Sequence, residues 1–340
     1  MIDLLVAGGG PAGLATAMYA TQAGLEAVVI DRRRAPIDKA CGEGMMPHTV
    51  AHLRKLGVVP HGKAFRGITY LDSKRSVRAD FTGGAGLGMR RTALHQAMTD
   101  AAEAAGVRII EGDVGEVTQD ENSVRCGGLQ ARYLAAADGL HSPIRRSLGL
   151  NLPSRGRKRW GIRRHFEMAP WSDTVEVYWS ADSRSEAYVT PVADDCVGVA
   201  ILTSEQGKFG DHLIDFPRLG DRLADATHGA DRAAGPLRQR VRDRVAGRVL
   251  LVGDAAGYVD ALTGEGLGIA FGGAEVLVKS VLADNPGDYD RQWRQMSRRY
   301  RFLTAGLLEA SGCKPIRSLI VPAAEALPKA FSGIVNLLAN

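Results

Sequence analysis

Three glycines near the N-terminus, Gly8, Gly10 and Gly13, have the spacing of a loop that holds phosphate groups. In such a loop the first glycine makes a tight turn, the second lets a pyrophosphate approach the backbone, and the third lets helix and strand pack closely. Asp31 follows Gly13 by eighteen residues, where an acid can hydrogen-bond ribose hydroxyls. We therefore predict dinucleotide binding in preference to an ordinary glycine-rich turn. The residues expected to contact the dinucleotide here are Gly8, Gly10, Pro11, Ala12, Gly13, Asp31 and Arg32.

Two further clusters of glycine and aspartate follow apolar runs that resemble strands. The first reads Ala137-Asp138-Gly139-Leu140-His141-Ser142-Pro143-Ile144-Arg145. The second reads Gly253-Asp254-Ala255-Ala256-Gly257 and leads to Thr263-Gly264-Glu265-Gly266-Leu267-Gly268. An aspartate before a glycine can simply cap a turn, and for Asp138 taken alone that is the preferred interpretation. The two clusters are more informative when they are considered together with the first glycine loop, because all three follow one another in a fixed order.

The set GxGxxG, DGxxSxxR and GDAA…GEG over residues 1–285 resembles the p-hydroxybenzoate-hydroxylase-like superfamily of FAD enzymes, which includes aromatic hydroxylases and geranylgeranyl reductases. The resemblance implies bound FAD and NADH or NADPH as a transient electron donor. Asp254 would bond the ribityl or ribose side of the flavin, and Arg91 stands where the family usually has an arginine against FAD. A helix start at 264–268 would direct N–H groups toward the flavin, whose reduced form carries negative charge. The residues that the resemblance adds to the cofactor site are Cys41, Gly42, Arg91, Asp138, Gly253, Asp254, Gly264, Glu265, Gly266 and Leu267.

Two activities fit this pattern, and we favour the first. A hydroxylase would pass oxygen from a flavin C4a-hydroperoxide to an aromatic or polyketide-like hydrophobic molecule. The alternative is a reductase of C=C bonds in a prenyl or lipid substrate. Lys39-Ala-Cys41-Gly42-Glu43-Gly44 resembles the flavin-side segment of the geranylgeranyl-reductase branch, although Cys41 could equally be a small packing residue. That branch usually shows Tyr-x-Trp-x-Phe-Pro where this chain reads Ala187-Tyr188-Val189-Thr190-Pro191, while Gly257 stands where many hydroxylases carry histidine.

Catalytic side chains are not assigned by the sequence. His48, His61, His95, His141 and His165 are all candidates, and an isolated histidine is more often structural than catalytic. A flavin-binding protein without turnover on small molecules is the third and least favoured interpretation.

The elements that must position these residues alternate between strand and helix. An apolar run at 2–7, a helix at 14–24 and a second run at 27–30 predict a β-turn-α-β unit with parallel strands. Residues 91–105, 205–245, 288–312 and 316–340 have helical patterns, whereas 155–203 alternates like an antiparallel sheet. We predict an α/β protein: a discontinuous Rossmann-type FAD-binding domain (1–70, 91–150 and 248–285), an inserted antiparallel β-sheet substrate domain (71–90 and 151–247) and a C-terminal helical segment (286–340).

Aromatic residues gather in the inserted sheet and could line a substrate pocket or simply form its packed face. They are Trp160, Phe166, Trp171, Tyr178, Trp179 and Tyr188. Arg163, Arg164 and His165 could bind an anionic or phenolic group, though an exposed strand edge is the preferred interpretation. The basic run 155–164 is read as a solvated linker or a contact for NAD(P)H phosphates. The apolar C-terminal helices could cover the pocket, form a homodimer face or touch a membrane surface.

Composition limits the remaining classes. The 340 residues carry 43 Lys+Arg against 38 Asp+Glu, a net charge of +5 that does not indicate a nucleic-acid partner. The four cysteines form no CxxC pair, so we expect neither a zinc site nor a disulfide framework, and no other spacing suggests a metal. The N-terminus lacks a signal-peptide pattern, and no apolar stretch is long enough to span a membrane. We expect a soluble cytoplasmic protein.

Overall fold

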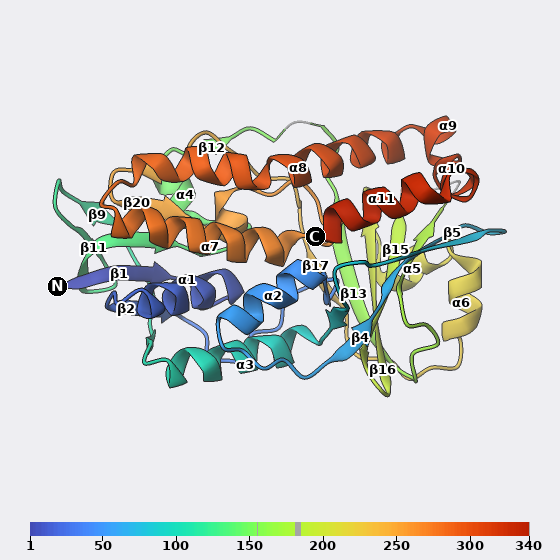
Figure 1. Ribbon diagram of the computed structural model, residues 1–340, viewed down its shortest axis with the longest axis horizontal. Helices are drawn as coiled ribbons and strands as arrows, with labels where there is room; N and C mark the ends of the chain where they lie inside the picture. Colours follow the sequence, from blue (N-terminus) through green and yellow to red (C-terminus); the bar gives the residue numbers. More distant parts are fainter. Residues whose placement is uncertain (155, 181–184, 340) are drawn as a thin grey trace.

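The first sheet joins strands that are far apart in the sequence (Figure 1). In the computed structural model, β1 (Ile2–Ala7) lies between β2 (Ala27–Asp31) and β11 (Leu129–Ala136), and all three run parallel. β8 (Arg108–Glu111) extends the sheet beyond β2, and β20 (Val249–Leu251) extends it beyond β11, again in parallel. Every residue of β2 and β20 is buried, as expected for strands covered on both faces. The predicted Rossmann-type parallel sheet is confirmed. The structure describes residues 1–154, 156–180 and 185–339.

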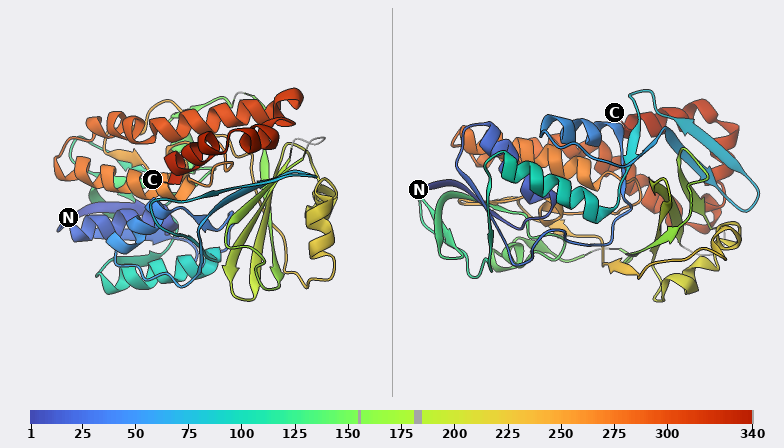
Figure 2. Two further views of the ribbon diagram at one scale, coloured as in Figure 1. Left: turned by 45° about the vertical axis from the view of Figure 1, so that its right-hand side comes forward. Right: turned by 90° about the horizontal axis from the view of Figure 1, so that it is seen from below.

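Helices surround this sheet and bring the two ends of the FAD-binding segment together. α1 (Pro11–Gln22) begins with proline in its first turn, where a missing N–H costs nothing, and it packs against β1, α3 (Arg91–Ala104) and α7 (Gly266–Leu282). α2 (Pro47–Lys55) also packs on α7. The long α8 (Gly287–Gly312) lies along the outer side of α7 in each view (Figure 2).

The second sheet stands beside the first and is almost wholly antiparallel, as predicted. Its order is β17 (Arg232–Ala234), β13 (Trp160–Glu167), β16 (Cys196–Thr203), β15 (Glu186–Ala193), β14 (Val175–Trp179), β5 (Gly67–Leu71) and β6 (Ser76–Asp80). The exception is β5, which runs parallel to β14. Residues 67–70, which we expected in the first domain, therefore contribute to the second sheet, and we propose the three-part division with that boundary moved.

Short elements complete the chain. A small sheet of β3 (Gly44–Met45), β7 (Gly86–Gly88) and β4 (Lys63–Phe65) sits between the two large ones, and β12 (Asn151–Leu152) pairs with β18 (Arg240–Val241). The first sheet also takes up β9 (Thr118–Gln119), β10 (Val124–Cys126) and β19 (Val245–Ala246). α4 (Pro143–Ser147) begins within the second glycine-aspartate cluster, and a 3-10 turn, η1 (Gly253–Ala256), is formed by the third.

Two helical predictions are wrong in detail. The only helices in residues 205–245, all of which the structure describes, are α5 (Phe209–Leu213) and α6 (Pro217–Leu223). Most of the remainder is loop, and β17 and β18 form there because their residues pair with distant strands. The segment 316–340 is broken into α9 (Lys314–Arg317), α10 (Ile320–Ala326) and α11 (Pro328–Ala339). Pro328 cannot donate a backbone hydrogen bond to α10, so a new helix starts there.

The second sheet has an apolar cluster on each face. α5 and α6 cover one face, and the C-terminal helices α10 and α11 cover the other, near β5 and β6. Within the described residues no single helix could cross a membrane by length and hydropathy, although the bent pair 314–326 and 328–339 passes that test jointly.

Candidate functional site

The first glycine loop has the geometry that its spacing predicts. Gly8 has φ +111°, and a Cβ there would lie 2.5 Å from the carbonyl oxygen of Ala137. A Cβ on Gly13 would lie 1.8 Å from the carbonyl oxygen of Gly8, so only glycine lets α1 start this close to β1. A Cβ on Gly10 would meet nothing within 4 Å. The middle glycine therefore faces open space at the N-terminus of α1, where the motif leaves room for a pyrophosphate.

Asp31 ends β2 and braces this loop. Its Oδ2 accepts a hydrogen bond from the Gly9 N–H at 2.8 Å, and its Oδ1 accepts one from the Arg33 N–H at 2.9 Å. The imidazole of His95 on α3 donates from Nε2 to the Gly9 carbonyl at 2.7 Å, while its Nδ1 accepts from the Ile37 N–H. Because Nδ1 accepts this hydrogen bond, it carries no proton; burial lowers the pKa of His95 in the same sense. The neighbouring Arg32 is exposed; contact of Asp31 or Arg32 with a ribose stays a prediction.

The three glycine-aspartate clusters converge in space. A Cβ on Gly253, which has φ +63°, would lie 2.6 Å from the Cβ of Ala12, so the third cluster packs directly on the first. The fully buried Arg145 joins the second cluster to the third, because its Nη1 donates to the carbonyls of Asp254 and Ala255 at 3.2 and 3.0 Å. Its other nitrogens donate to Leu140, Asn151 and Gln239. Sequence reasoning quoted Arg145 in the motif but gave it no role.

Asp138 has the turn-capping role considered for it, and its contact with a cofactor stays a prediction. Its Oδ2 accepts from the Ile144 N–H at 3.0 Å, which caps the turn into α4. Its Oδ1 is buried without a hydrogen-bond partner among the described residues. Burial raises the pKa of Asp138. The cap is thus confirmed, and one oxygen remains for a ligand.

Buried polar atoms without partners occur at three residues of the predicted cofactor site. In the part of the chain that the structure describes, they include Arg91 Nη1, Asp138 Oδ1 and Glu265 Oε1. Arg91, on the first turn of α3, faces Asp254 and Cys41, and burial lowers its pKa. Burial raises the pKa of Asp254, while the nearby Lys39 and Arg91 oppose that rise. An unpaired buried polar atom costs about 1–3 kcal/mol, so a polar ligand here would relieve several such penalties. These residues fit FAD.

The start of α7 is tied to the end of the chain. Oε2 of Glu265 lies 2.9 Å from Nε2 of His48, whose Nδ1 donates to the Ala339 carbonyl at 3.1 Å. Burial lowers the pKa of His48, but the hydrogen bond and charge of Glu265 outweigh it, and the net direction is upward. Gly266 begins α7 at this pair, next to Leu267 and the exposed Gly264. The helix dipole there favours negative charge. These four residues keep their predicted place at a helix N-terminus, and their contact with flavin stays a prediction.

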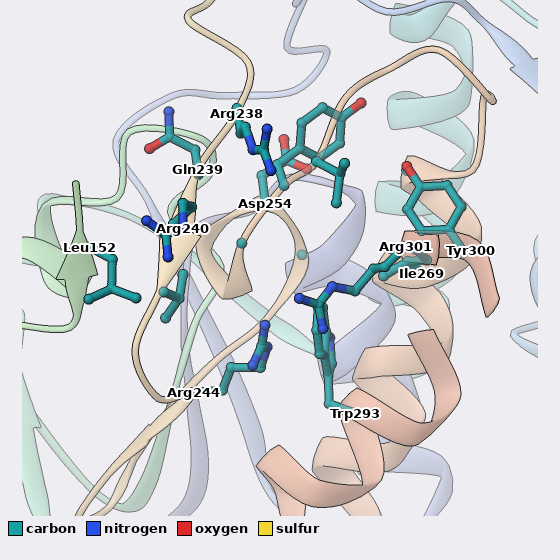
Figure 3. A pocket seen from close by; sticks show the side chains of 16 residues that line it. Leu152, Arg238, Gln239, Arg240, Arg244, Asp254, Ile269, Trp293, Tyr300 and Arg301 are labelled. Carbon is teal, nitrogen blue, oxygen red and sulfur yellow. The ribbon is translucent and has the colours of Figure 1, made fainter. Parts of the chain in front are cut away.

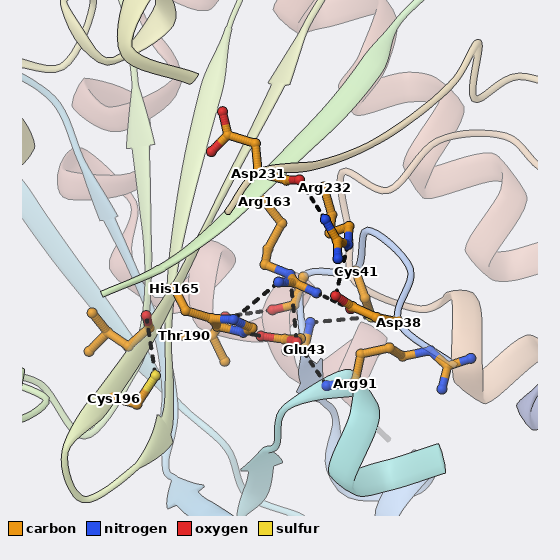
Figure 4. A network of polar contacts seen from close by, with 12 residues as sticks. Asp38, Cys41, Glu43, Arg91, Arg163, His165, Thr190, Cys196, Asp231 and Arg232 are labelled. Atoms are coloured by element: carbon orange, nitrogen blue, oxygen red, sulfur yellow. Dashed lines mark hydrogen bonds and ion pairs between the residues drawn. The ribbon is translucent and has the colours of Figure 1, made fainter. Parts of the chain in front are cut away.

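Glu43 is the centre of a second network, which sequence reasoning missed (Figure 4). It is 3% exposed and has φ +60°, and its Oε1 accepts from the Arg91 N–H at 2.8 Å. Its Oε2 lies 2.6 Å from His165 Nε2, and Arg163 Nη1 lies 3.1 Å from His165 Nδ1. A guanidinium can only donate, so Nδ1 accepts and the imidazole donates from Nε2 to Glu43. In the sequence, Glu43 stood in the quoted 39–44 segment and Arg163 and His165 were named as candidate polar contacts, but nothing in their spacing joined them.

The same network fixes the segment Cys41–Gly44 against the second sheet. Asp38 accepts from Arg163 Nη2 at 2.5 Å and from Arg232 Nε at 2.9 Å. The Thr190 hydroxyl donates to the Gly42 carbonyl at 2.8 Å. A Cβ on Gly42 would meet nothing within 4 Å, so its outer side is open. Burial raises the pKa of the Cys41 thiol, which argues against a thiolate nucleophile.

Three arginines of the basic run pair with carboxylates, whereas Arg157 and Lys158 are exposed. Arg159 contacts Glu186, Arg163 contacts Asp38, and Arg164 Nε lies 2.6 Å from Asp231. The first residue of the run, Arg155, lies outside the described residues. Burial and the nearby Asp260 raise the pKa of Glu186 to about 7, although Arg159 opposes them.

The aromatic residues of the second sheet divide between its faces. Trp179 and Tyr188 lie on the face covered by the C-terminal helices, and Tyr188 donates to the Leu262 carbonyl at 2.9 Å. Phe166, Trp171 and Tyr178 lie on the opposite face with α5 and α6. Alternation along the strands therefore sends half of the set into ordinary packing. A separate pocket, which borders Asp254, is drawn in Figure 3.

Comparison with known proteins agrees with this geometry. Residues 1–288 match the family described as FAD binding domain, so the chain belongs to that family. It is an FAD-dependent oxidoreductase, which confirms the predicted superfamily and cofactor.

Individual relatives are similar over most of their length. The chain is 30% identical over 340 residues to digeranylgeranylglycerophospholipid reductase 1 of Methanothermobacter thermautotrophicus, covering 86% of this chain and 82% of the relative. It is 27% identical over 307 residues to menaquinone reductase of Mycobacterium tuberculosis, covering 78% and 72%. The crystal structure of a flavoprotein/dehydrogenase from Cytophaga hutchinsonii superposes with a TM-score of 0.86 over 99% of this chain and 92% of that one, at 17% identity. That likeness shows the fold.

Proposed function

We propose that this protein is an FAD-dependent reductase that saturates C=C bonds of a prenyl or related lipid chain, with NADH or NADPH as the electron source. The observation that carries this proposal is the apolar face of the second sheet, which β5 and β14 form beside the Cys41–Gly44 segment and which α10 and α11 cover. Tyr70 and Trp179 meet there edge to face, with ring centroids 5.4 Å apart, and the ring centroid of Tyr70 lies 4.8 Å from that of Phe331 of α11. Such a face suits a long apolar chain better than a single polar ring. Relatives whose names state reduction of prenylated lipids support the same class.

Each group of residues has a separate task in this proposal. FAD, when bound, supplies the electron pair that the substrate double bond accepts. The N-terminus of α1 and Arg91 hold the cofactor's charged groups, and the N-terminus of α7 stabilises negative charge on its ring. Glu43 orients Arg91 through the backbone N–H and fixes Cys41 and Gly42. The covered apolar face excludes water and places the chain against the ring.

Hydroxylation of a hydrophobic ring, the activity that we favoured from the sequence, is the second candidate. One observation favours it: β15 carries Tyr188 and Thr190 in the segment where the reductase branch usually has bulky aromatic residues. Both hydroxyls donate to carbonyls of neighbouring loops, so this strand braces the site instead of offering an aromatic wall for an isoprenoid.

Mass spectrometry separates the two candidates. FAD-loaded protein is incubated with NADPH and a geranylgeranylated lipid or a menaquinone, with and without oxygen. If the protein is a reductase, its product is heavier than the substrate by two mass units per saturated bond and forms without oxygen. A product heavier by one oxygen atom, formed only in air, would overturn the proposal in favour of hydroxylation. A bound flavin that neither NADH nor NADPH reduces would overturn both the reductase and the hydroxylase candidates, because each takes its electrons from NADH or NADPH.

A further inference from the structure

A cationic pocket lies on the side of the 253–257 turn that faces α8, away from the first glycine loop. It has a volume of about 200 Å³, and its lining includes Gly253, Asp254 and Gly266 of the predicted cofactor site but no residue of the first glycine loop. Four arginines line it: Arg238, Arg240, Arg244 and Arg301. Asp254 is the one acidic residue in the lining. The described lining therefore carries an excess of three positive charges, counted as four arginines minus one aspartate.

The arginines reach the pocket from α8 and from the segment around β18, with Arg244 in the loop between β18 and β19. Arg238 and Arg240 come from the segment that leads into β18, and Arg301 comes from α8 (Figure 3). Arg244 lies with its guanidinium 3.5 Å from the ring centroid of Trp293, and Arg301 approaches the same ring at 5.6 Å. Like charges held around one aromatic ring repel each other unless an anion lies between them. Arginine is also the residue whose planar fork matches phosphate oxygens.

Arg244, which lines the pocket, has a buried hydrogen-bond donor without an acceptor among the described residues. The residue is 5% exposed, and its Nη1 bonds Asp290 at 2.7 Å. Asp290 is shared with Arg294, so it does not neutralise Arg244 alone. Nε of Arg244 is buried with no hydrogen-bond partner among the described residues. A buried guanidinium N–H without an acceptor is costly, and an anionic oxygen in the pocket would satisfy it.

We propose that this pocket binds the phosphate or pyrophosphate group of a small ligand, separately from FAD. Trp293, Tyr258 and Tyr300 add flat apolar surface beside the arginines, so the ligand can carry a ring or an apolar chain next to its phosphate. Two sources share this chemistry: a nicotinamide dinucleotide and a phosphorylated lipid. The 253–257 turn carries Asp254 between this pocket and the predicted flavin site. A ligand bound in the pocket would therefore alter the surroundings of the cofactor.

The test uses FAD-saturated protein and inorganic pyrophosphate as the probe, with binding followed by calorimetry. We expect Arg240→Gln and Arg301→Gln each to weaken pyrophosphate binding about tenfold, the equivalent of one charge-assisted hydrogen bond. Arg298→Gln, an exposed position on α8 outside the pocket lining, is the matched control and should bind as the parent does. Arg244→Gln should lose more, and retained FAD absorbance and melting temperature show that it is folded.

Competition against pyrophosphate by NADPH or by a short-chain phosphatidic acid then identifies the source of the phosphate. Parent-like binding by both Arg240→Gln and Arg301→Gln would overturn the proposal. Equal weakening in Arg298→Gln would also overturn it, because the effect would then be general charge screening. Release of FAD by pyrophosphate would show that the pocket belongs to the flavin site and would refute a separate site.

Discussion

Replacing Gly13 by alanine should impair FAD binding by the first glycine loop without removing any side chain. Both Gly13 in α1 and Gly306 in α8 are helical, so alanine gains roughly 1 kcal/mol of helix propensity at either position. A Cβ at Gly306 would meet nothing within 4 Å, whereas a Cβ at Gly13 would lie 1.8 Å from the Gly8 carbonyl oxygen. Since a carbon–oxygen contact needs about 3.3 Å, the start of α1 must retreat by about 1.5 Å.

That retreat should weaken FAD binding strongly. Overpacking of this kind costs about 1–3 kcal/mol of folding free energy, and loss of two charge-assisted hydrogen bonds to the pyrophosphate would weaken FAD binding about a hundredfold. Flavin fluorescence quenching on titration of apoprotein measures affinity, and urea unfolding measures stability. Gly306→Ala should bind FAD normally and unfold at slightly higher urea. If Gly13→Ala binds FAD within threefold of the parent and is as stable as Gly306→Ala, the steric argument is wrong.

Three further outcomes follow from the buried networks. Arg145→Ala leaves five carbonyl or amide acceptors without their donor and should lower the free energy of unfolding by about 3–5 kcal/mol. The exposed Arg146→Ala should change it little in the same denaturation. Glu43→Gln replaces one carboxylate oxygen by an NH₂ group, which cannot accept the hydrogen bond from the Nε2–H of His165. This substitution should speed hydrogen exchange in residues 38–44, and unchanged protection there would contradict the proposed bracing role. A folded-state pKa of about 7 for Glu186 lies above its ordinary 4.5, so its contribution to stability is full below pH 4.5 and is lost as pH rises through 7. That loss is about 3 kcal/mol. Glu186→Gln should flatten the pH dependence of the free energy of unfolding between pH 5 and 8, and an unaltered slope would show that another group causes this dependence.

The elements with local signals were predicted well. β1, α1 and β2 follow from an apolar run, three spaced glycines and a second apolar run, all within about thirty residues. α3 was placed to within one residue because its apolar positions repeat at helical spacing. The three clusters met in space because parallel strands place their carboxyl ends at one edge of a sheet.

The errors lie where distant partners decide the structure. Residues 232–234 have helix-forming composition but pair with the edge of β13, a contact that no local pattern reveals. Glu43 and His165 are separated by 122 positions, so their hydrogen bond could not be read from spacing. The pocket between β18 and α8 was missed for the same reason, since its arginines come from segments with no shared motif.

The position of β20 at one side of the parallel sheet has a consequence for synthesis and truncation. Its pairing partner β11 ends at Ala136, yet β20 begins only at Val249, so a ribosome must make more than a hundred further residues before the sheet can be completed. Chain order and spatial order conflict here, and contacts of such long separation form slowly. A nascent chain that stops before Val249 would contain the complete first glycine loop but lack η1 and α7, which close the other side of its binding space. Cofactor capture should therefore be a late event, and N-terminal fragments should emerge without colour.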